Sequence, residues 1–336
     1  MKLSVLIPMY NAEAFIDNCL ISLINQDLSS TDYEIIVMDD GSTDNCFKIV
    51  NEYVKVHNNI FLYSENNAGS DSTRNKLLKL AKGEYVYFID ADDYLAYNSL
   101  GLILEYLQIH NLDFIGFDTL KTNHLTHFLL EKEYSEKLFS AVHNGLEYIR
   151  DNRNLRHEVW WYIVKRSLID DNNIAFDENG NNADVIFTIK LLLKANRLVY
   201  CSLPIHRYVQ TKGSVMRGYS SEKKRKLIDS MFNMIISYSE LINSIQAEIL
   251  EDKEIILENL KFRRDVFTFF NIINMLRLKY RKEIFQKRIN QLDEVNAYPV
   301  NNFLNNHYKT LKYSLLNKII NNKPFLLNLV KIRNTF

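Results

Sequence analysis

The sequence predicts an α/β protein with a mainly parallel central sheet and a helical C-terminal region. In the first hundred residues, short runs that are apolar on both faces alternate with longer amphipathic runs. This alternation is typical of a parallel sheet that helices cover on each side. Several of the short runs end in acidic or amide side chains, where open parallel sheets bind their ligands. From about residue 221 onward the apolar spacing is helical and glycine is absent.

The elements of the first hundred residues follow from the apolar spacing in chain order. Strands are expected at 3–7, 34–38, 60–63 and 85–89, and helices at about 15–24, 43–57 and 71–82. Ser42 or Thr43 is expected to cap the second helix, because a side-chain oxygen there satisfies a free backbone N–H group. Gly41 allows a sharp turn before that helix. Gly83 suits the position beyond the end of the third helix.

The remainder of the chain divides into two regions. Strands near 113–117 and 197–201 and a helix at about 184–195 extend the alternating pattern. Because only helical spacing follows, we predict a boundary near residue 220, with a helical region over 221–336.

Composition limits the classes of partner and the expected compartment. The chain has 336 residues, with 41 Lys plus Arg and 41 Asp plus Glu, so no global field favours nucleic acid as a partner. Cys19, Cys46 and Cys201 match neither a disulfide framework nor zinc-ligand spacing, which favours a reducing compartment. Because a strand-like run begins at Leu3, we expect no signal peptide, and no stretch approaches the ~20 apolar residues that cross a bilayer. The expected location is the cytoplasm, including the inner face of the cell membrane.

The strongest chemical signal is the sequence Phe88-Ile-Asp-Ala-Asp-Asp93, in which an apolar strand runs into three carboxylates. Two carboxylates separated by one residue can hold a divalent cation together with phosphate oxygens, because Mg²⁺ and Mn²⁺ prefer oxygen ligands. A solvated acidic turn after a strand is the alternative interpretation of this motif taken alone.

Two further strand ends carry polar groups. Asp39 and Asp40 end the strand at 34–38, and an ordinary capped turn does not explain two adjacent carboxylates there. The run Pro8-Met-Tyr-Asn11 follows the first strand. Tyr10 is expected either to stack on a base or to cover the sheet.

In combination these motifs resemble the family-two inverting glycosyltransferases, which have the nucleotide-sugar-binding fold known as GT-A. Four motifs occur in the family's order: Ser4-Val-Leu-Ile-Pro-Met-Tyr-Asn11, Val37-Met-Asp-Asp-Gly-Ser-Thr-Asp44, Asn67-Ala-Gly-Ser-Asp-Ser-Thr-Arg-Asn75 and Asp90-Ala-Asp-Asp93. The resemblance is very specific over residues 3–95 and looser over 155–217. It implies a catalytic domain over 1–220, with a nucleotide-sugar-binding half at 1–100 and an acceptor half at 101–220.

The resemblance also implies roles for individual residues in binding the donor. Tyr10 and Asp40 would hold the nucleobase, and Arg74 would reach the base or the diphosphate, which suits its fixed, always-charged fork. Pro8 and Asn11 belong to the same substrate-binding set. Asp90 would contact the ribose or a metal-bound water, Asp92 would coordinate Mn²⁺ or Mg²⁺, and Asp93 would support that ligand from behind.

The looser region would supply the catalytic base. Asp184 falls on the family's Asp at a helix start, whereas Ala183 replaces the Glu that commonly precedes it. An acidic residue favoured by the helix macrodipole is the alternative interpretation of Asp184. In the segment that follows the last expected strand, Lys212 and Arg217 would close over the diphosphate.

The implied function is transfer of a hexose, with inversion, from a nucleoside-diphosphate donor (a UDP-sugar) to a saccharide or lipid-linked saccharide acceptor. Such enzymes make capsular, O-antigen and exopolysaccharides in bacteria. An Asp-dependent phosphatase is an alternative, but that class expects Thr or Val where this chain has Tyr94. A dinucleotide-dependent dehydrogenase is excluded by the absence of G-x-G-x-x-G from the sequence. A nucleotide-sugar-binding relic without catalysis is the second alternative, because of Ala183.

The C-terminal region has an unusual charge distribution. After Glu294 there are six basic residues and no acid, and Val266–Leu278 is almost wholly apolar. We expect peripheral association of this region with an anionic membrane, where lipid-linked acceptors reside. A helical packing domain with a solvated basic face is the alternative.

Overall fold

The computed structural model describes residues 1–130, 135–178, 183–210, 220–246, 252–304 and 308–335. The chain divides into two compact units. The first unit consists of Met1–Tyr148, His157–Glu178 and Phe187–Arg217, and the second of Ile149–Arg156, Asn179–Ile186 and Gly218–Phe336.

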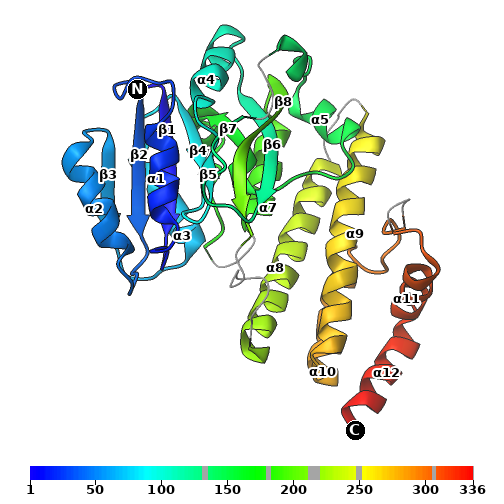
Figure 1. Cartoon of the computed structure of the whole chain (residues 1–336). Helices are drawn as coiled ribbons and strands as arrows, with labels where there is room; N and C mark the ends of the chain where they lie inside the picture. The colour runs from blue at the N-terminus through cyan, green and yellow to red at the C-terminus, as the bar shows by residue number, and fades with distance from the viewer. Residues whose placement is uncertain (131–134, 179–182, 211–219, 247–251, 305–307, 336) are drawn as a thin grey trace. The chain divides into compact units, whose positions relative to one another are not determined.

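The first unit is built on an eight-stranded sheet with the strand order β3-β2-β1-β4-β7-β6-β8-β5 (Figure 1). The strands are β1 (Leu3–Met9), β2 (Tyr33–Asp39), β3 (Ile60–Ser64), β4 (Tyr85–Phe88), β5 (Tyr94–Leu95), β6 (Phe114–Thr122), β7 (Tyr162–Lys165) and β8 (Leu198–Val209). Strand β1 pairs in parallel with β2 and β4, β2 with β3, and β6 with β8. Strands β4, β6 and β5 pair antiparallel with their other neighbours. The predicted α/β class with a mainly parallel sheet is confirmed.

Helices connect the strands and cover the sheet. The helices in this part of the chain are α1 (Ile16–Ile24), α2 (Cys46–Val56), α3 (Ser70–Leu80), α4 (Leu100–Ile109), α5 (Gly145–Asp151), α6 (Arg166–Asp170) and α7 (Ala183–Lys194), with short 3₁₀ turns at Glu136–Leu138 and Val159–Trp161. Val5 and Ile7 of β1 share one buried cluster with Leu20 and Leu23 of α1. Burial of each such side chain stabilises the fold by about 1.5–3 kcal/mol, which explains why strands with continuous apolar runs form this sheet.

The start of α2 differs from the prediction. The helix begins at Cys46, whose backbone N–H donates to Asp44 (3.1 Å), and not near residue 43. The hydroxyl of Ser42 accepts from the backbone N–H of Asn11 (2.9 Å), and the Thr43 N–H donates to the Asn11 side-chain oxygen (2.8 Å). The prediction that Ser42 or Thr43 caps α2 is therefore wrong: these residues join the loops after β1 and β2.

Two glycines are required by close approaches. Gly41 has φ +73°, and a Cβ there would lie 2.9 Å from the backbone nitrogen of Asn67. A Cβ at Gly83 would lie 2.5 Å from the backbone nitrogen of Ser4. Gly83 therefore lets the chain that follows α3 pass close to β1, a packing reason that helix-end statistics do not contain.

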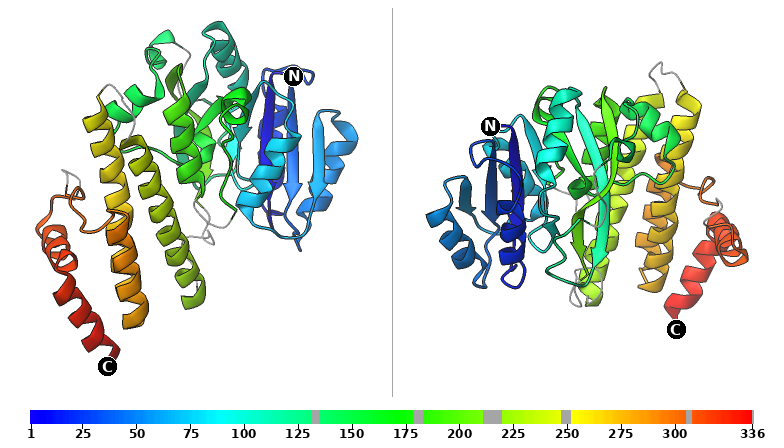
Figure 2. Two further views of the ribbon diagram at one scale, coloured as in Figure 1. Left: turned by 180° about the vertical axis from the view of Figure 1, so that it is seen from behind. Right: turned by 45° about the horizontal axis from the view of Figure 1, so that its top comes forward.

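The second unit is helical over its C-terminal part. Its helices are α8 (Ser221–Gln246), α9 (Lys253–Arg277), α10 (Lys282–Glu294), α11 (Leu311–Asn321) and α12 (Lys323–Thr335). Helices α8 and α9 lie side by side in all three views (Figures 1 and 2). The apolar run at Val266–Leu278 forms the last part of α9 and the residue that follows it, and buries Phe269, Ile272 and Met275. This segment is therefore a packing helix and is not available for a membrane surface. Across the described residues, no helix has both the length and the apolar content that a bilayer crossing needs.

Candidate active site

The loops that follow β1, β2 and β4 meet at one edge of the sheet, because these strands are parallel. They enclose a cavity of about 570 Å³ together with the start of α3. The cavity is lined by Pro8, Met9, Tyr10, Asn11, Ala12, Phe15, Asp40, Asn67, Gly69, Ser70, Thr73, Arg74, Asp90, Ala91 and Asp92. The structure thus brings together seven of the predicted site residues: Pro8, Tyr10, Asn11, Asp40, Arg74, Asp90 and Asp92.

Asp40 anchors the loop that leads into α3. Its two carboxylate oxygens accept hydrogen bonds from the backbone N–H groups of Ala68 (2.6 Å) and Gly69 (3.0 Å). Asp39 also holds neighbouring segments together, because its carboxylate accepts hydrogen bonds from the backbone N–H of Ser42 (3.1 Å) and the hydroxyl of Ser64 (3.2 Å). The adjacent carboxylates therefore organise the cavity wall. Each Asp40 oxygen has a second lone pair with which it could accept from a ligand.

Tyr10 differs from the residues around it in exposure. Its side chain lines the cavity and is 53% exposed, whereas Met9 is buried in the sheet. A solvated aromatic ring at the cavity mouth offers a face for stacking. Of the two predicted roles for Tyr10, covering the sheet is therefore disfavoured.

Arg74 is held between two carboxylates. Its Nη2 lies 3.0 Å from Asp90 Oδ1 and its Nη1 lies 3.4 Å from Asp71 Oδ1. The centre of the guanidinium also lies 5.7 Å from the centroid of the Phe176 ring. These contacts fix the guanidinium at the cavity wall beside Asp90. Asp71 was missed by the sequence analysis, because nothing in the motif distinguishes a buried acid in a first helical turn from an exposed one.

Burial raises the pKa of Asp71 to about 6, and Arg74 opposes this shift only in part. The unfolded chain ionises this group near pH 4, so the folded state loses stability relative to the unfolded state as the pH rises from about 4 to about 6. The difference between the folded and unfolded pKa values lowers the free energy of unfolding by at most roughly 3 kcal/mol. We expect Asp71→Asn to be more stable than the parent by about 1–3 kcal/mol at pH 8, with the difference shrinking as the pH falls and approaching zero below about pH 4. Urea unfolding of both proteins at pH 8 and pH 5 measures the difference in their free energies of unfolding. An Asp71→Asn protein that is less stable at both values would show that the Arg74 ion pair outweighs desolvation.

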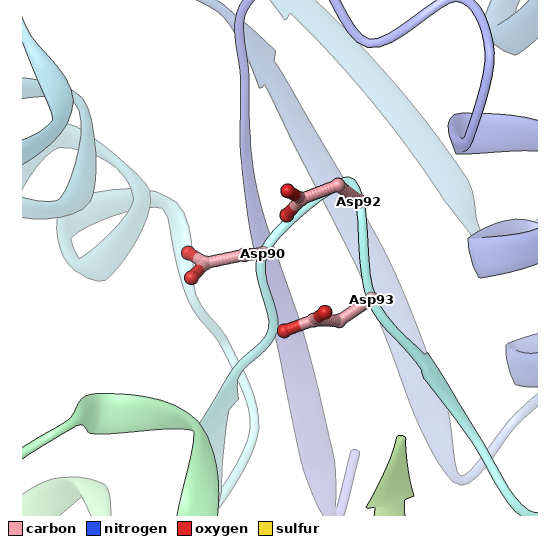
Figure 3. A group of neighbouring side chains, drawn as sticks. All are labelled: Asp90, Asp92 and Asp93. Carbon is pink, nitrogen blue, oxygen red and sulfur yellow. The ribbon is translucent and has the colours of Figure 1, made fainter. Parts of the chain in front are cut away.

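The three carboxylates Asp90, Asp92 and Asp93 lie on one turn between β4 and β5 (Figure 3). One oxygen of each lies within 4.8 Å of the others. Desolvation and the neighbouring acids raise the pKa of Asp92 to about 7 and that of Asp93 well above its usual range. Crowded carboxylates of this kind form a hard-oxygen donor set whose mutual repulsion a divalent cation relieves. The donor set therefore fits Mg²⁺ or Mn²⁺.

The side chain of Asp93 is buried and is hydrogen-bonded within the protein. It is 1% exposed, its Oδ1 accepts from the backbone N–H of Val209 (2.8 Å), and its Oδ2 lies 3.2 Å from His206 Nε2. The His206 ring is buried and stacks on Trp160 at 4.4 Å. Asp93 and His206 therefore hold the acidic turn against β8, whereas Asp90 and Asp92 line the cavity.

Asn75 is a second residue that the sequence analysis missed. Its side-chain amide donates to the Phe176 carbonyl and to Glu178 Oε1, both at 2.9 Å, and its oxygen accepts from the Phe176 N–H at 2.9 Å. The segment that carries Asp177 and Glu178 is therefore attached to α3. A partner 101 positions away in the chain leaves no local signal in the sequence.

The remaining predicted residues lie outside this cavity's lining or outside the described residues. Asp184 is in the first turn of α7, half-buried, and its Oδ1 accepts from the backbone N–H of Val185 (3.0 Å). It belongs to the second unit. Ala183 is buried. Lys212 and Arg217 fall within 211–219, outside the described residues.

Three comparisons relate this geometry to known proteins. The model of Glycosyl transferase family 2 matches residues 4–170, about half of the chain. Poly(ribitol-phosphate) beta-glucosyltransferase of Bacillus spizizenii is 32% identical over 201 residues, which is 59% of this chain and 30% of that protein. Uncharacterized glycosyltransferase YibD of Escherichia coli is 29% identical over 251 residues, 74% of this chain and 72% of that protein. The chain thus spans less than a third of the Bacillus relative's length.

The same fold occurs in a solved structure with a bound nucleotide sugar. The crystal structure of S. aureus TarS 1-349 in complex with UDP-GlcNAc has a TM-score of 0.70 and 25% identity, covering 100% of this chain and 92% of that one. The family match includes β1 to β4 and the loops that line the cavity, which removes the phosphatase alternative. The chain belongs to glycosyl transferase family 2.

Proposed function

We propose that this chain transfers a hexose from a UDP-sugar, with inversion, to a saccharide or lipid-linked saccharide acceptor during the synthesis of a surface polysaccharide. The observation that carries the proposal is the cavity at the carboxyl ends of β1, β2 and β4, which combines an exposed aromatic ring, a held guanidinium and paired carboxylates. In this proposal residues 1–220 form the catalytic domain, with the donor half at 1–100 and the acceptor half at 101–220.

Each cavity residue has a task in holding the donor. Tyr10 stacks on the base, and Asp40 accepts from a base N–H through a lone pair that Ala68 and Gly69 leave available. Pro8 and Asn11 shape the wall beside Tyr10. Arg74 faces the diphosphate from its fixed position beside Asp90, which lowers the entropy lost on binding.

Asp92, with Asp90 beside it, would hold Mn²⁺ or Mg²⁺. When bound, the ion supplies positive charge against the negative charge that develops on the diphosphate leaving group. Asp93 keeps the turn in place from behind through Val209. Lys212 and Arg217 add positive charge over the diphosphate.

Asp184 is the general base. Its carboxylate takes the proton from the acceptor hydroxyl as that oxygen attacks the anomeric carbon on the face opposite the diphosphate. One displacement inverts the configuration at that carbon. The support is its position at the start of α7, where the backbone N–H of Val185 restrains the carboxylate, because proton transfer requires a held geometry.

Thermal unfolding with a panel of UDP- and GDP-sugars, each with Mn²⁺, tests donor binding. A donor at ~100 times its dissociation constant should stabilise the protein by roughly 2.7 kcal/mol. Donor hydrolysis and transfer, measured with the donor that stabilises most, then separate an active enzyme from a binding relic. If no nucleotide sugar raises the unfolding temperature, the proposed function is wrong.

The C-terminal helices form the part of this chain that we place on a membrane. Leu311 and Leu315 of α11 are exposed and share a face with Lys318, since they lie four and seven positions apart. On α12, Phe325, Leu329 and Ile332 form a second exposed apolar stripe with the same spacing. The basic residues after Glu294 are Lys309, Lys312, Lys318, Lys323, Lys331 and Arg333. Apolar stripes with basic neighbours and no acid suit the cytoplasmic face of an anionic bilayer.

Vesicle sedimentation tests this placement. Each basic residue near an anionic surface contributes ~1 kcal/mol, so Lys312→Gln with Lys318→Gln should weaken binding to phosphatidylglycerol vesicles by at least ~10-fold. Phe325→Glu with Ile332→Glu should abolish it, because charged groups would enter the apolar layer. Ile255→Glu, which changes an exposed apolar residue of α9, is the matched control and should bind like the parent. Binding that is equal on neutral and anionic vesicles and indifferent to salt would contradict the proposal.

A further inference from the structure

The helical unit contains a polar pocket that the proposed chemistry does not use. It has a volume of about 370 Å³ and lies between α8, α9 and the chain after α10. Within the described part of the chain, its lining contains two basic residues and no acid: Asn243, Gln246, Lys261, Arg264, Asn296, Tyr298, Pro299, Asn301 and Asn302. A pocket with this lining favours an anionic ligand that also carries hydroxyl groups.

Arg264 supplies a buried guanidinium to this pocket. The residue is 4% exposed, and its Nε and Nη2 donate to Asp265 Oδ1 at 3.0 and 2.7 Å. Both hydrogen bonds leave the guanidinium along the same edge, the one formed by Nε and Nη2. Among the described residues, no acceptor hydrogen-bonds to its Nη1, although Arg264 lines the pocket. Lys261, one turn earlier on α9, adds a half-buried ammonium to the lining.

The opposite wall is held rigidly. Asp265 Oδ2 accepts from the backbone N–H groups of Asn301 (3.1 Å) and Asn302 (2.8 Å). The backbone of Val300 exchanges two hydrogen bonds with the side chain of Asn321, both at 2.9 Å. A wall fixed from two sides forms the pocket before any ligand arrives, which reduces the entropy lost on binding.

The amides of the lining are available for a ligand. In the part of the chain that the structure describes, no group forms a hydrogen bond with the side chains of Asn243, Gln246 and Asn301. An amide offers both donors and an acceptor, which match the hydroxyl groups of a sugar or polyol. Lys261 and Arg264 match an oxyanion, since charge-assisted hydrogen bonds are the stronger ones.

We propose that this pocket binds an oxyanion-bearing saccharide or polyol, the chemical class of the proposed acceptor. This use as an acceptor site rests on the proposed function. The oxyanion has two chemical sources, a phosphate or a carboxylate group, and the experiment below separates them.

Saturation-transfer NMR on the full chain tests the pocket with defined probes. UDP and Mg²⁺ are present throughout, so that the donor cavity is occupied. The probes are sn-glycerol 3-phosphate and glucuronate, with glycerol and glucose as their uncharged counterparts. We expect at least one anionic probe to bind and its counterpart to bind more weakly; which anion binds identifies the source.

The variants locate the binding. Lys261→Ala should weaken binding of the anionic probe by about 10- to 100-fold, the usual effect of losing one charge-assisted hydrogen bond, and Asn243→Ala should weaken it less. Lys224→Ala removes the same charge from α8, ~28 Å along the helix from Asn243, and should bind like the parent. Donor hydrolysis should be unchanged in all three.

The outcomes distinguish this pocket from the proposed function. If neither anion binds, or if Lys261→Ala and Lys224→Ala bind equally, the pocket proposal is overturned, even when nucleotide sugars stabilise the protein. If the anion binds and its binding depends on Lys261, while no nucleotide sugar stabilises the protein, the pocket proposal is supported and the proposed function is wrong.

Discussion

Asp184→Asn is expected to lower the rate of sugar transfer by ~10²- to 10⁴-fold, the usual contribution of general-base catalysis. Nucleotide affinity should be unchanged, because the base acts on the acceptor hydroxyl and not on the donor. Asparagine keeps the size of the side chain and an oxygen that can accept from the Val185 N–H, so the start of α7 should be preserved. Transfer under single-turnover conditions and nucleotide binding by calorimetry measure the two effects separately.

The neighbouring acids Asp177 and Glu178 provide the comparison for this experiment. Glu178 accepts a hydrogen bond from Asn75 (2.9 Å), so Glu178→Gln should retain most of the parental rate, since the glutamine oxygen can still accept that bond. Asp177→Asn should behave similarly. Near-parental transfer by Asp184→Asn combined with loss of transfer in either neighbour would move the base to that neighbour and leave the enzyme class intact.

Asp92→Asn should strongly lower the rate of transfer under conditions that support the parent. The change removes an anionic oxygen from the turn that holds Asp90 and Asp93 within 4.8 Å, and a neutral amide is a poor ligand for a hard cation. The loss should reach the ~10²- to 10³-fold range that a lost electrostatic stabiliser of the leaving group produces. The fold should remain intact, because Asp92 lies on a turn between two strands and its replacement by a neutral amide removes repulsion between the three carboxylates.

EDTA should reproduce the effect of Asp92→Asn in the parent protein, and added Mn²⁺ should restore the parent but not the variant. Asp170→Asn is a suitable control, since it removes a carboxylate from an exposed ion pair with Arg166 on α6, a contact of little energetic weight. Full activity of the parent in EDTA would show that the transfer needs no divalent ion.

The cavity was largely predictable because its residues occupy the ends of consecutive parallel strands. A continuous apolar run marks such a strand, and the residue type that follows it shows what lies at the sheet edge. Asp40, Asp90 and Asp92 were found in this way. The order of the strands and the antiparallel pairing of β7 with β4 were not predictable, because pairing depends on contacts between distant segments.

Side chains that act through distant partners left no such signal. Asn75 is part of a recognisable motif, yet its function depends on Phe176, which the chain reaches only 101 positions later. For Ser42, the local preference for a helix cap led to a wrong prediction, because its hydroxyl has a partner outside the helix. Asn11, from another loop, competes for that hydroxyl, and the tertiary contact prevails over the local preference.

The attachment of Asp93 to β8 has a consequence for how the protein acquires its activity during synthesis. Asp93 and Val209 are separated by 116 positions, and β4 pairs with β7, which ends at Lys165. A nascent chain that has emerged only to residue 100 therefore carries β1 to β4 and the acidic turn but leaves the β4 edge unpaired, a template for aggregation. Loop closure over such distances makes late strand pairing slow. The acidic turn can form its contact with β8 only after Val209 has been synthesised. We therefore expect the N-terminal half alone to need chaperones and not to serve as a minimal nucleotide-binding fragment.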